Sequence, residues 1–307
     1  PKLQPKRLKS QRLRATKKID MNKPAGDSGG LVRFRVDLAY DGTDFAGWAK
    51  QPGLRTVEGD LVKMFEKIFG KSKNDFDMRV AGRTDSGVHA KHQVCHLDIP
   101  EKRLSRIGRD PLNAFRLNTL ISEDLIILDI HPITSDFDAR FSAVGRRYRY
   151  TIVDPEFKKD PMMVRYALTH KRVLDVKLMN SAAKTLVGLN DFAAFCKPRA
   201  GASTIRNLTV FEVLRQKDGL ITIDIHADAF CHNMIRSLVG SIIAVSDGRL
   251  SVQDLVGVQK TGKRANKFKT IDAKGLSLES IDYPEPAEYA KQAILNRVMR
   301  ETSDNSV

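Results

Sequence analysis

The sequence predicts an α+β fold made of two mixed halves with similar element order and an antiparallel sheet. Two observations support this class: strand-like and helix-like patterns recur in the same order in each half of the 307 residues, and an Asp-Gly turn joins two alternating apolar runs. The 41% hydrophobic content is enough to bury a sizeable core. There is no apolar run of membrane-spanning length and no signal-peptide pattern, so we expect a soluble, cytoplasmic protein.

The first half opens with an alternating run over residues 32–38, which predicts a strand with one buried face. Apolar residues then recur at three- and four-residue spacing over 57–68, as in an amphipathic helix that ends near Gly70. A short apolar strand at 78–81 leads into a glycine turn, and a further strand is predicted over 93–99.

The second half repeats this order with a strand over 147–153 and a helix around 177–189. A hairpin is predicted next, because the sequence Lys217-Asp218-Gly219 connects two alternating runs. The remaining predicted elements are helices over 234–243, 252–258 and 287–301 and a strand over 276–281.

Positive charge dominates the chain: 52 Lys and Arg face 37 Asp and Glu, a formal net charge of +15. Such an excess favours a polyanionic partner, and nucleic acid is the default one, with a merely solvated charge surplus as the alternative. Residues 1–30 hold much of the excess and end in a linker rich in Gly, Ser and Pro, so we predict a disordered basic tail. The tail is either an arm that grips RNA or a stretch that precedes a true start at Met21.

The cysteines and histidines predict no metal site. Cys95, Cys196 and Cys231 lie far apart in the sequence, so we expect buried apolar side chains rather than a disulfide framework or a thiolate cluster. His89 and His92 are spaced so that a strand would point them to opposite faces.

The most informative segment is Ala81-Gly82-Arg83-Thr84-Asp85-Ser86-Gly87-Val88-His89-Ala90. Glycines on both sides allow a sharp turn that presents the carboxylate of Asp85 to a ligand. Arg83 is close enough to pair with that carboxylate, or to contact a phosphate or a sugar. The alternative is an ordinary turn in which Asp85 caps its own backbone.

This segment resembles the catalytic signature of the TruA-type tRNA pseudouridine synthases, Gly-Arg-Thr-Asp-Ala-Gly-Val-His-Ala, from which only Ser86 departs. Four further blocks that resemble the family follow the family's order and lie at residues 39–48, 137–150, 230–240 and 275–284. The resemblance therefore covers about residues 31–284.

The resemblance implies two similar mixed α/β lobes that share a mainly antiparallel sheet, with the active cleft between them. It divides the chain into a basic tail and linker, an N-terminal catalytic lobe, a C-terminal lobe, and a C-terminal helix and tail: 1–30, 31–137, 138–284 and 285–307. The implied activity is isomerisation of uridine to pseudouridine at positions 38 to 40 of the tRNA anticodon arm. The implied enzyme is a homodimer that binds tRNA and needs no cofactor, because the reaction has no net redox change and no leaving group.

The resemblance also implies roles for individual residues. Asp85 matches the catalytic carboxylate, nucleophile or base. Arg83 matches an arginine that occupies the stack when the target base flips out, and Tyr148 matches a tyrosine that packs against that base. Arg236 lies in an otherwise apolar helix and needs an anionic partner, which the family makes Asp85. Further expected contacts to the substrate are Arg140, Arg146 and His89.

Two other classes of function remain open from the residues alone. A non-catalytic RNA-binding or tRNA-folding protein would explain the charge without using Asp85. A metal-dependent nuclease built on the histidines would predict strand cleavage that EDTA abolishes.

Overall fold

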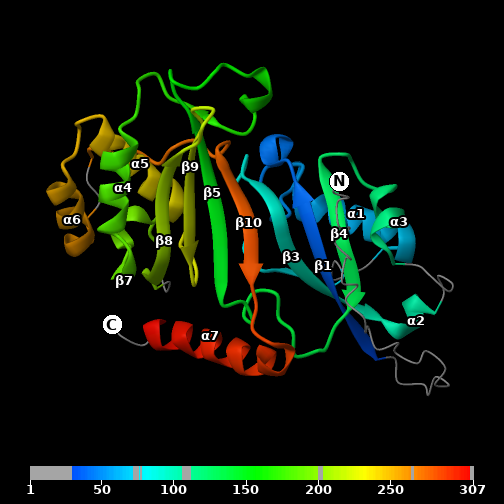
Figure 1. Ribbon diagram of the computed structural model, residues 1–307. Coiled ribbons are helices and arrows are strands. Elements are labelled where there is room, and N and C mark those ends of the chain that lie inside the picture. The colour runs from blue at the N-terminus through cyan, green and yellow to red at the C-terminus, as the bar shows by residue number, and fades with distance from the viewer. Residues whose placement is uncertain are drawn as a thin grey trace, which may run out of the picture.

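The computed structural model describes residues 30–71, 76, 78–105, 112–199, 203–263 and 266–304. Of the predicted basic tail and linker, residues 1–30, residues 1–29 lie outside this part of the chain. The described strands form one sheet (Figure 1) in the order β4-β1-β3-β10-β5-β9-β8-β7, with β2 beside β3 and β6 beside β5. The strands of the first half are β1 (Leu31–Tyr40), β2 (Arg79–Val80), β3 (His89–Pro100) and β4 (Leu125–Pro132). The later strands are β5 (Gly145–Val153), β6 (Leu168–Thr169), β7 (Gly188–Asp191), β8 (Ile205–Arg215), β9 (Ile221–Ala227) and β10 (Leu276–Asp282).

Strand β10 joins the two halves of the sheet, although it is the last strand in the described sequence. It runs antiparallel to β5 and pairs in parallel with β3, where Ser277 lies opposite His89 and Leu278 opposite Ala90. Apart from this pair and the short β5–β6 pair, the strand pairs of the described chain are antiparallel. The prediction of a mainly antiparallel sheet in an α+β fold is confirmed.

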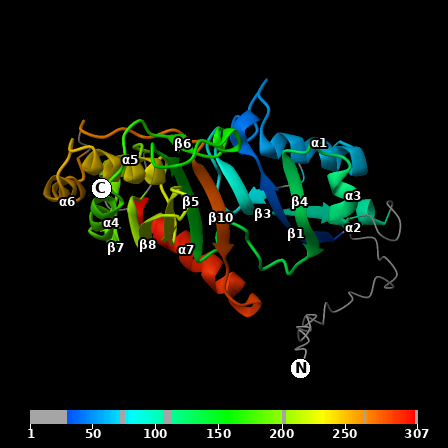
Figure 2. The ribbon, with the colours of Figure 1, turned by 45° about the horizontal axis from the view of Figure 1, so that its top comes forward.

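Helices cover one side of this sheet (Figure 2), with α1 over the first half and α5 over the second. The α-helices of the described chain are α1 (Val57–Phe69), α2 (Glu101–Leu104), α3 (Ala114–Asn118), α4 (Val176–Lys184), α5 (Met234–Ser246), α6 (Val252–Thr261) and α7 (Tyr289–Asp304). Helix α1 begins where the Thr56 side chain accepts a hydrogen bond from the amide of Gly59, and it buries one apolar face. Helix α5 is apolar almost all round and is buried along nearly its whole length.

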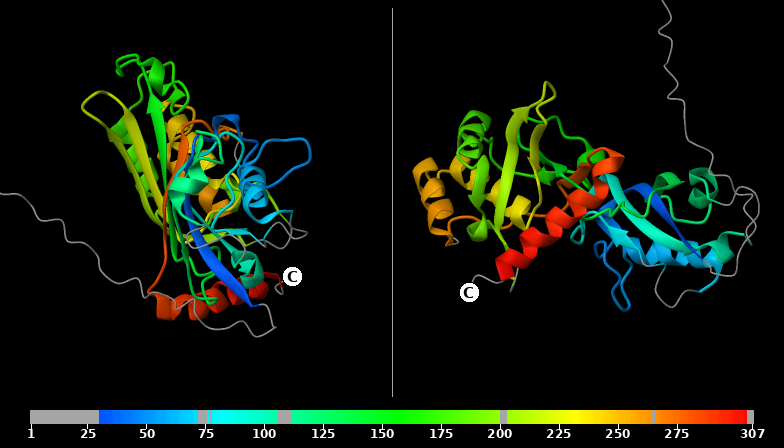
Figure 3. Two further views of the ribbon diagram at one scale, coloured as in Figure 1. Left: turned by 90° about the vertical axis from the view of Figure 1, so that its right-hand side faces the viewer. Right: turned by 90° about the horizontal axis from the view of Figure 1, so that it is seen from below.

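Helix α7 lies across one end of the sheet, as the view from below in Figure 3 shows. It is fastened to the segment between β4 and β5. The hydroxyl of Ser142 donates to the carbonyl of Tyr289 over 3.1 Å, and the amide of Asn296 donates to the carbonyl of Phe141 over 2.7 Å. Asp138 adds an ion pair with Arg297 at 3.0 Å. In the described ranges no helix is both long and apolar enough to cross a membrane.

Several boundaries differ from the predictions. Strand β3 begins at His89, four residues earlier than predicted. Helix α4 ends at Lys184 rather than near 189, because the chain turns at Gly188 (φ +116°) into β7. Strand β4 and helix α3 were not predicted. The run Leu-Ile-Ile-Leu at the start of β4 hides its alternation, since Ile126 is an exposed apolar side chain on this edge strand.

Candidate active site

The loop that carries Asp85 is pinned against the turn that follows β1. The amide of Trp48 donates to the carbonyl of Thr84 over 3.1 Å, and the amide of Gly87 donates to the carbonyl of Phe45 over 3.3 Å. The hydroxyls of Tyr40 and Thr84 are 2.8 Å apart. The two sequence blocks at 39–48 and 81–90 therefore fold as one unit.

Two glycines make this packing possible. Gly47 has a φ of +90°, and a Cβ atom on it would lie 2.9 Å from the carbonyl oxygen of Thr84. Gly87 has a φ of +77°. Side chains at either position would meet a left-handed backbone, and at Gly47 also a steric clash.

The carboxylate of Asp85 is partly open to solvent, with 38% of its side chain exposed, and it is approached by Arg236 from the first turn of α5 and by His232 from the turn just before that helix. Arg236 Nη1 lies 3.5 Å from Oδ2, and His232 Nε2 lies 3.6 Å from Oδ1. The guanidinium of Arg236 is itself fixed, because its Nε donates to the carbonyl of Ile271 over 2.7 Å. Asp85 is thus an accessible anion held between cationic or donor groups.

Tyr148 lies beneath the same loop, on β5. It is 8% exposed, and its ring meets that of Phe230 edge to face at 5.3 Å. A Cβ atom on Gly82 would be 3.9 Å from the Tyr148 hydroxyl, so that hydroxyl lies close to the beginning of the loop. Burial raises the pKa of the Tyr148 hydroxyl, and the nearby Asp85 charge raises it further, so the phenol stays neutral.

A cluster of arginines borders the site. Burial, and then the positive charges of Arg83, Arg146 and Arg199, lower the pKa of Arg140. Arg83 and Arg140 are exposed. The arginine paired with Asp85 in the described chain is Arg236 rather than Arg83. Arg83 lies on the same loop as Asp85, whereas Arg236 approaches the carboxylate from α5.

Arg146 is placed differently from the exposed arginines. It is 8% exposed, and its guanidinium donates to the carbonyls of Asp228, Ala81 and Arg140 at 2.6, 3.2 and 2.8 Å. Burial lowers the pKa of this group. Arg146 thus connects the start of β5 to three separate segments, including the strand end just before the Asp85 loop.

His89 also lies in the interior. Its Nδ1 accepts a hydrogen bond from the amide of Gly42 over 3.0 Å, and its Nε2 is 3.0 Å from the carbonyls of Arg165 and Lys274. The other histidines of β3 have separate partners: His92 contacts Asp37, and His96 accepts from the amide of Ala139. Nowhere in the described ranges do three His, Cys, Asp or Glu side chains gather as a metal site requires.

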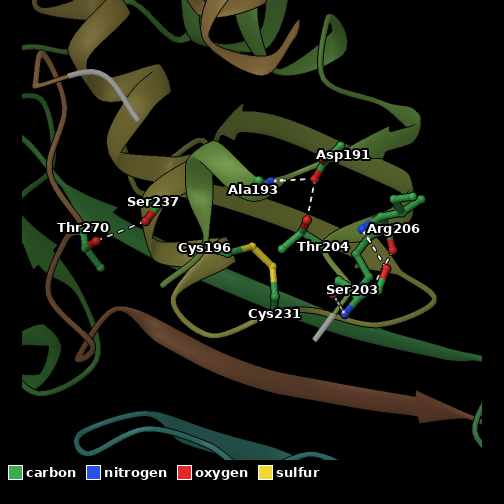
Figure 4. Close-up of a disulfide and its surroundings, with 10 residues drawn as sticks. Asp191, Ala193, Cys196, Ser203, Thr204, Arg206, Cys231, Ser237 and Thr270 are labelled. Carbon is green, nitrogen blue, oxygen red and sulfur yellow. Dashed lines mark hydrogen bonds between the residues drawn. A yellow bond between two sulfur atoms is a disulfide. The ribbon is translucent and has the colours of Figure 1, made fainter. Parts of the chain in front are cut away.

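The structure corrects the prediction for two of the three cysteines. Cys196 and Cys231 form a disulfide (Figure 4), with their Cα atoms 5.8 Å apart. Their separation of 35 residues hides this pairing, which arises because the short helix η4 (Ala193–Phe195) ends beside the turn before α5. The amide of Lys197 donates to the carbonyl of His232 over 2.9 Å and joins the same two segments. Cys95 is free and buried, as predicted, and burial raises the pKa of its thiol.

The sequence reasoning missed His232. Local pattern does not mark it, because it lies in the turn before α5 and approaches Asp85 only when that turn packs against the Asp85 loop. Together, the residues around Asp85 present an oriented carboxylate, the neighbouring aromatic ring of Tyr148 and a group of arginines. This combination suits chemistry on one unit of a polyanion, with the arginines meeting phosphates.

Comparisons with known proteins agree with this chemistry. Residues 182–284 match the family model described as tRNA pseudouridine synthase. The tRNA pseudouridine synthase A of Frankia casuarinae is 44% identical over 272 residues, which cover 88% of this chain and 96% of the relative. That of Mycobacterium leprae is 43% identical over 278 residues, with coverage of 88% and 96%. The chain therefore belongs to the tRNA pseudouridine synthase family and is an isomerase that converts uridine to pseudouridine in tRNA.

Proposed function

We propose that Asp85 is the catalytic carboxylate, and that the enzyme acts on uridines at positions 38 to 40 of the tRNA anticodon arm. The observation that carries the proposal is the partly exposed Asp85 carboxylate with Arg236 at 3.5 Å, on a loop bounded by glycines. Arg236 places a positive charge beside one carboxylate oxygen and so fixes the direction of that oxygen.

The reaction needs such a group and no external reagent. The bond between uracil N1 and ribose C1′ breaks, the uracil turns, and a bond forms between C5 and C1′. C5 then loses its proton and N1 gains one, so atoms and electrons balance without an oxidant or a leaving group. Asp85 serves as nucleophile on the ring or sugar, or as the base that moves a proton.

Substrate binding is assigned to the aromatic and cationic neighbours of Asp85. Tyr148 packs against the target base, a contact worth roughly 1–3 kcal/mol per base. Arg83 fills the stack that the flipped base leaves, which offsets part of an extrusion cost of a few kcal/mol. Arg140 contacts phosphate, whereas Arg146 and His89 act through the fold by holding the segments around the site in place.

The remaining assignments follow from the resemblance. We infer a catalytic lobe over 31–137 and a second lobe over 138–284, with the C-terminal helix and tail at 285–307. The enzyme is a homodimer and acts in the cytoplasm, where it meets its tRNA substrate.

Pseudouridine mapping by carbodiimide-blocked primer extension tests the proposal. Unmodified tRNA transcripts are incubated with wild type, Asp85→Asn and the control Asp224→Asn. Asp224 is a matched control because it is 31% exposed and is also paired with an arginine, Arg149 at 2.8 Å. We expect wild type and Asp224→Asn to modify positions 38 to 40, and Asp85→Asn to lose about a thousandfold or more in rate.

Two results would count against the proposal. Substantial modification by Asp85→Asn would remove the catalytic role of the carboxylate. Pseudouridine confined to sites outside the anticodon arm would leave the isomerase activity intact and overturn the assignment of positions.

A further inference from the structure

We propose that His232 is a second positioning residue for Asp85, a role that rests on the catalytic carboxylate proposed above. His232 Nε2 lies 3.6 Å from Oδ1 of Asp85, while Arg236 Nη1 lies 3.5 Å from Oδ2. Each carboxylate oxygen thus has its own neighbouring donor, one from the first turn of α5 and one from the turn just before it. Two donors on two oxygens fix the rotation of the carboxylate, which one donor alone does not.

The backbone around His232 is held at three successive residues. Cys231, just before it, is bonded to Cys196. The carbonyl of His232 itself accepts the amide of Lys197 over 2.9 Å. Asn233, just after it, has the left-handed φ of +66°. Asn is one of the few non-glycine residues that adopt this conformation readily, so it lets the chain turn sharply between His232 and α5.

The contact at 3.6 Å is longer than a hydrogen bond. Catalytic contacts are often loose before substrate binds and shorten in the complex. The imidazole is half exposed, at 50% of its side chain, so it stands at the open side of the carboxylate where a nucleotide enters. From there its Nε2–H turns Oδ1 toward the cleft and keeps Asp85 in the orientation that the reaction requires.

Single-turnover kinetics with enzyme in excess over tRNA transcript test the role, because they separate the rate constant at saturation from the half-saturating enzyme concentration. The variants are His232→Ala, which removes the donor, and His232→Gln, whose amide N–H replaces it. His131→Ala is the matched control, since His131 is also an exposed histidine beside an aspartate, with Nδ1 3.0 Å from Asp129 Oδ2 on β4.

We expect His232→Ala to lower the rate constant about tenfold with half-saturation unchanged within about twofold. His232→Gln should stay within about threefold of wild type, and His131→Ala should match it. A residue that merely supports the turn would not distinguish Gln from Ala.

Other results overturn the inference. If only half-saturation changes in His232→Ala, the side chain is an RNA contact. If Ala and Gln lose the same activity and both lower the melting temperature, it is a structural residue. Asp85→Asn separates the two proposals: an active Asp85→Asn defeats the catalytic carboxylate itself, whereas an inactive Asp85→Asn beside a fully active His232→Ala defeats only the role of His232.

Discussion

The amide of Trp48 donates a hydrogen bond to the carbonyl of Thr84 over 3.1 Å, and so joins the turn after β1 to the residue just before Asp85. This bond brings the backbone at 47–48 into contact with the backbone at Thr84. The contact leaves no room for a side chain on Gly47. The position of the proposed catalytic carboxylate is therefore determined by a turn nearly forty residues earlier in the sequence.

We expect Gly47→Ala to destabilise the protein and to slow catalysis. The added Cβ would lie 2.9 Å from Thr84 O at a φ of +90°, so a loss of about 2 kcal/mol or more is expected. The matched control is Gly53→Ala, where φ is +72° but no atom lies within 4 Å, so only the conformational cost of about 1 kcal/mol applies. Urea denaturation and single-turnover rates measure both effects, and equal losses in the two variants would contradict the packing argument.

Arg236→Lys should lower the rate at least about tenfold, although it preserves the charge. The guanidinium binds the Ile271 carbonyl through Nε at 2.7 Å and reaches Asp85 through Nη1, and a single ammonium cannot do both. Arg149→Lys is the control, because Arg149 pairs with Asp224 on the sheet face opposite Tyr148. Wild-type single-turnover rates in Arg236→Lys would show that charge alone suffices.

The disulfide should contribute to stability only under oxidising conditions. Closing a loop of 35 residues is worth about 3–4 kcal/mol in the chain-entropy account. Cys231→Ser should therefore unfold at lower urea than the oxidised wild type, and dithiothreitol should bring the wild type down toward the variant. Cys231→Ser with and without dithiothreitol is the control. If the reductant also shifts the urea midpoint of this variant, the effect on the wild type does not come from the disulfide.

Protonation of His96 should weaken the fold as pH falls. Burial, and next the charge of Arg33, lowers the pKa of His96 to about 4, well below its ordinary value of 6.5. The unfolded chain therefore binds the proton first, and stability that is complete above about pH 6.5 is lost as pH falls toward 4, to an extent of about 3 kcal/mol. In His96→Asn, Oδ1 replaces Nδ1 as acceptor for the Ala139 amide, so we expect a flatter stability curve between these pH values.

Arg140→Gln should weaken tRNA binding and reduce its dependence on salt. One fewer phosphate contact lowers the slope of log K against log salt by about one. Lys91→Gln is the control, because Lys91 is an exposed cation that already pairs with Glu279 at 3.1 Å. An unchanged slope in Arg140→Gln, measured by filter binding at several salt concentrations, would remove Arg140 from the phosphate contacts.

Local pattern accounts for the elements that were predicted correctly. Strand β1 and helices α1 and α5 show clear periodicity, and glycines mark the Asp85 loop. What sequence reasoning missed depends on contacts between distant segments. The pairing of Cys196 with Cys231 and the approach of His232 to Asp85 exist only once η4, α5 and the loop are packed together.

The position of β10 in the sequence determines when the two halves of the sheet can join. Residues 276–282 pair with β3 on one side and β5 on the other, so the two halves of the described sheet are joined by a strand that is synthesised after both of its neighbours. Until a ribosome has released that segment, β3 and β5 each present an unpaired edge, the kind of surface that recruits other chains and chaperones. A truncated mRNA that ends shortly before this strand would thus yield two half-sheets with unpaired edges and no cleft.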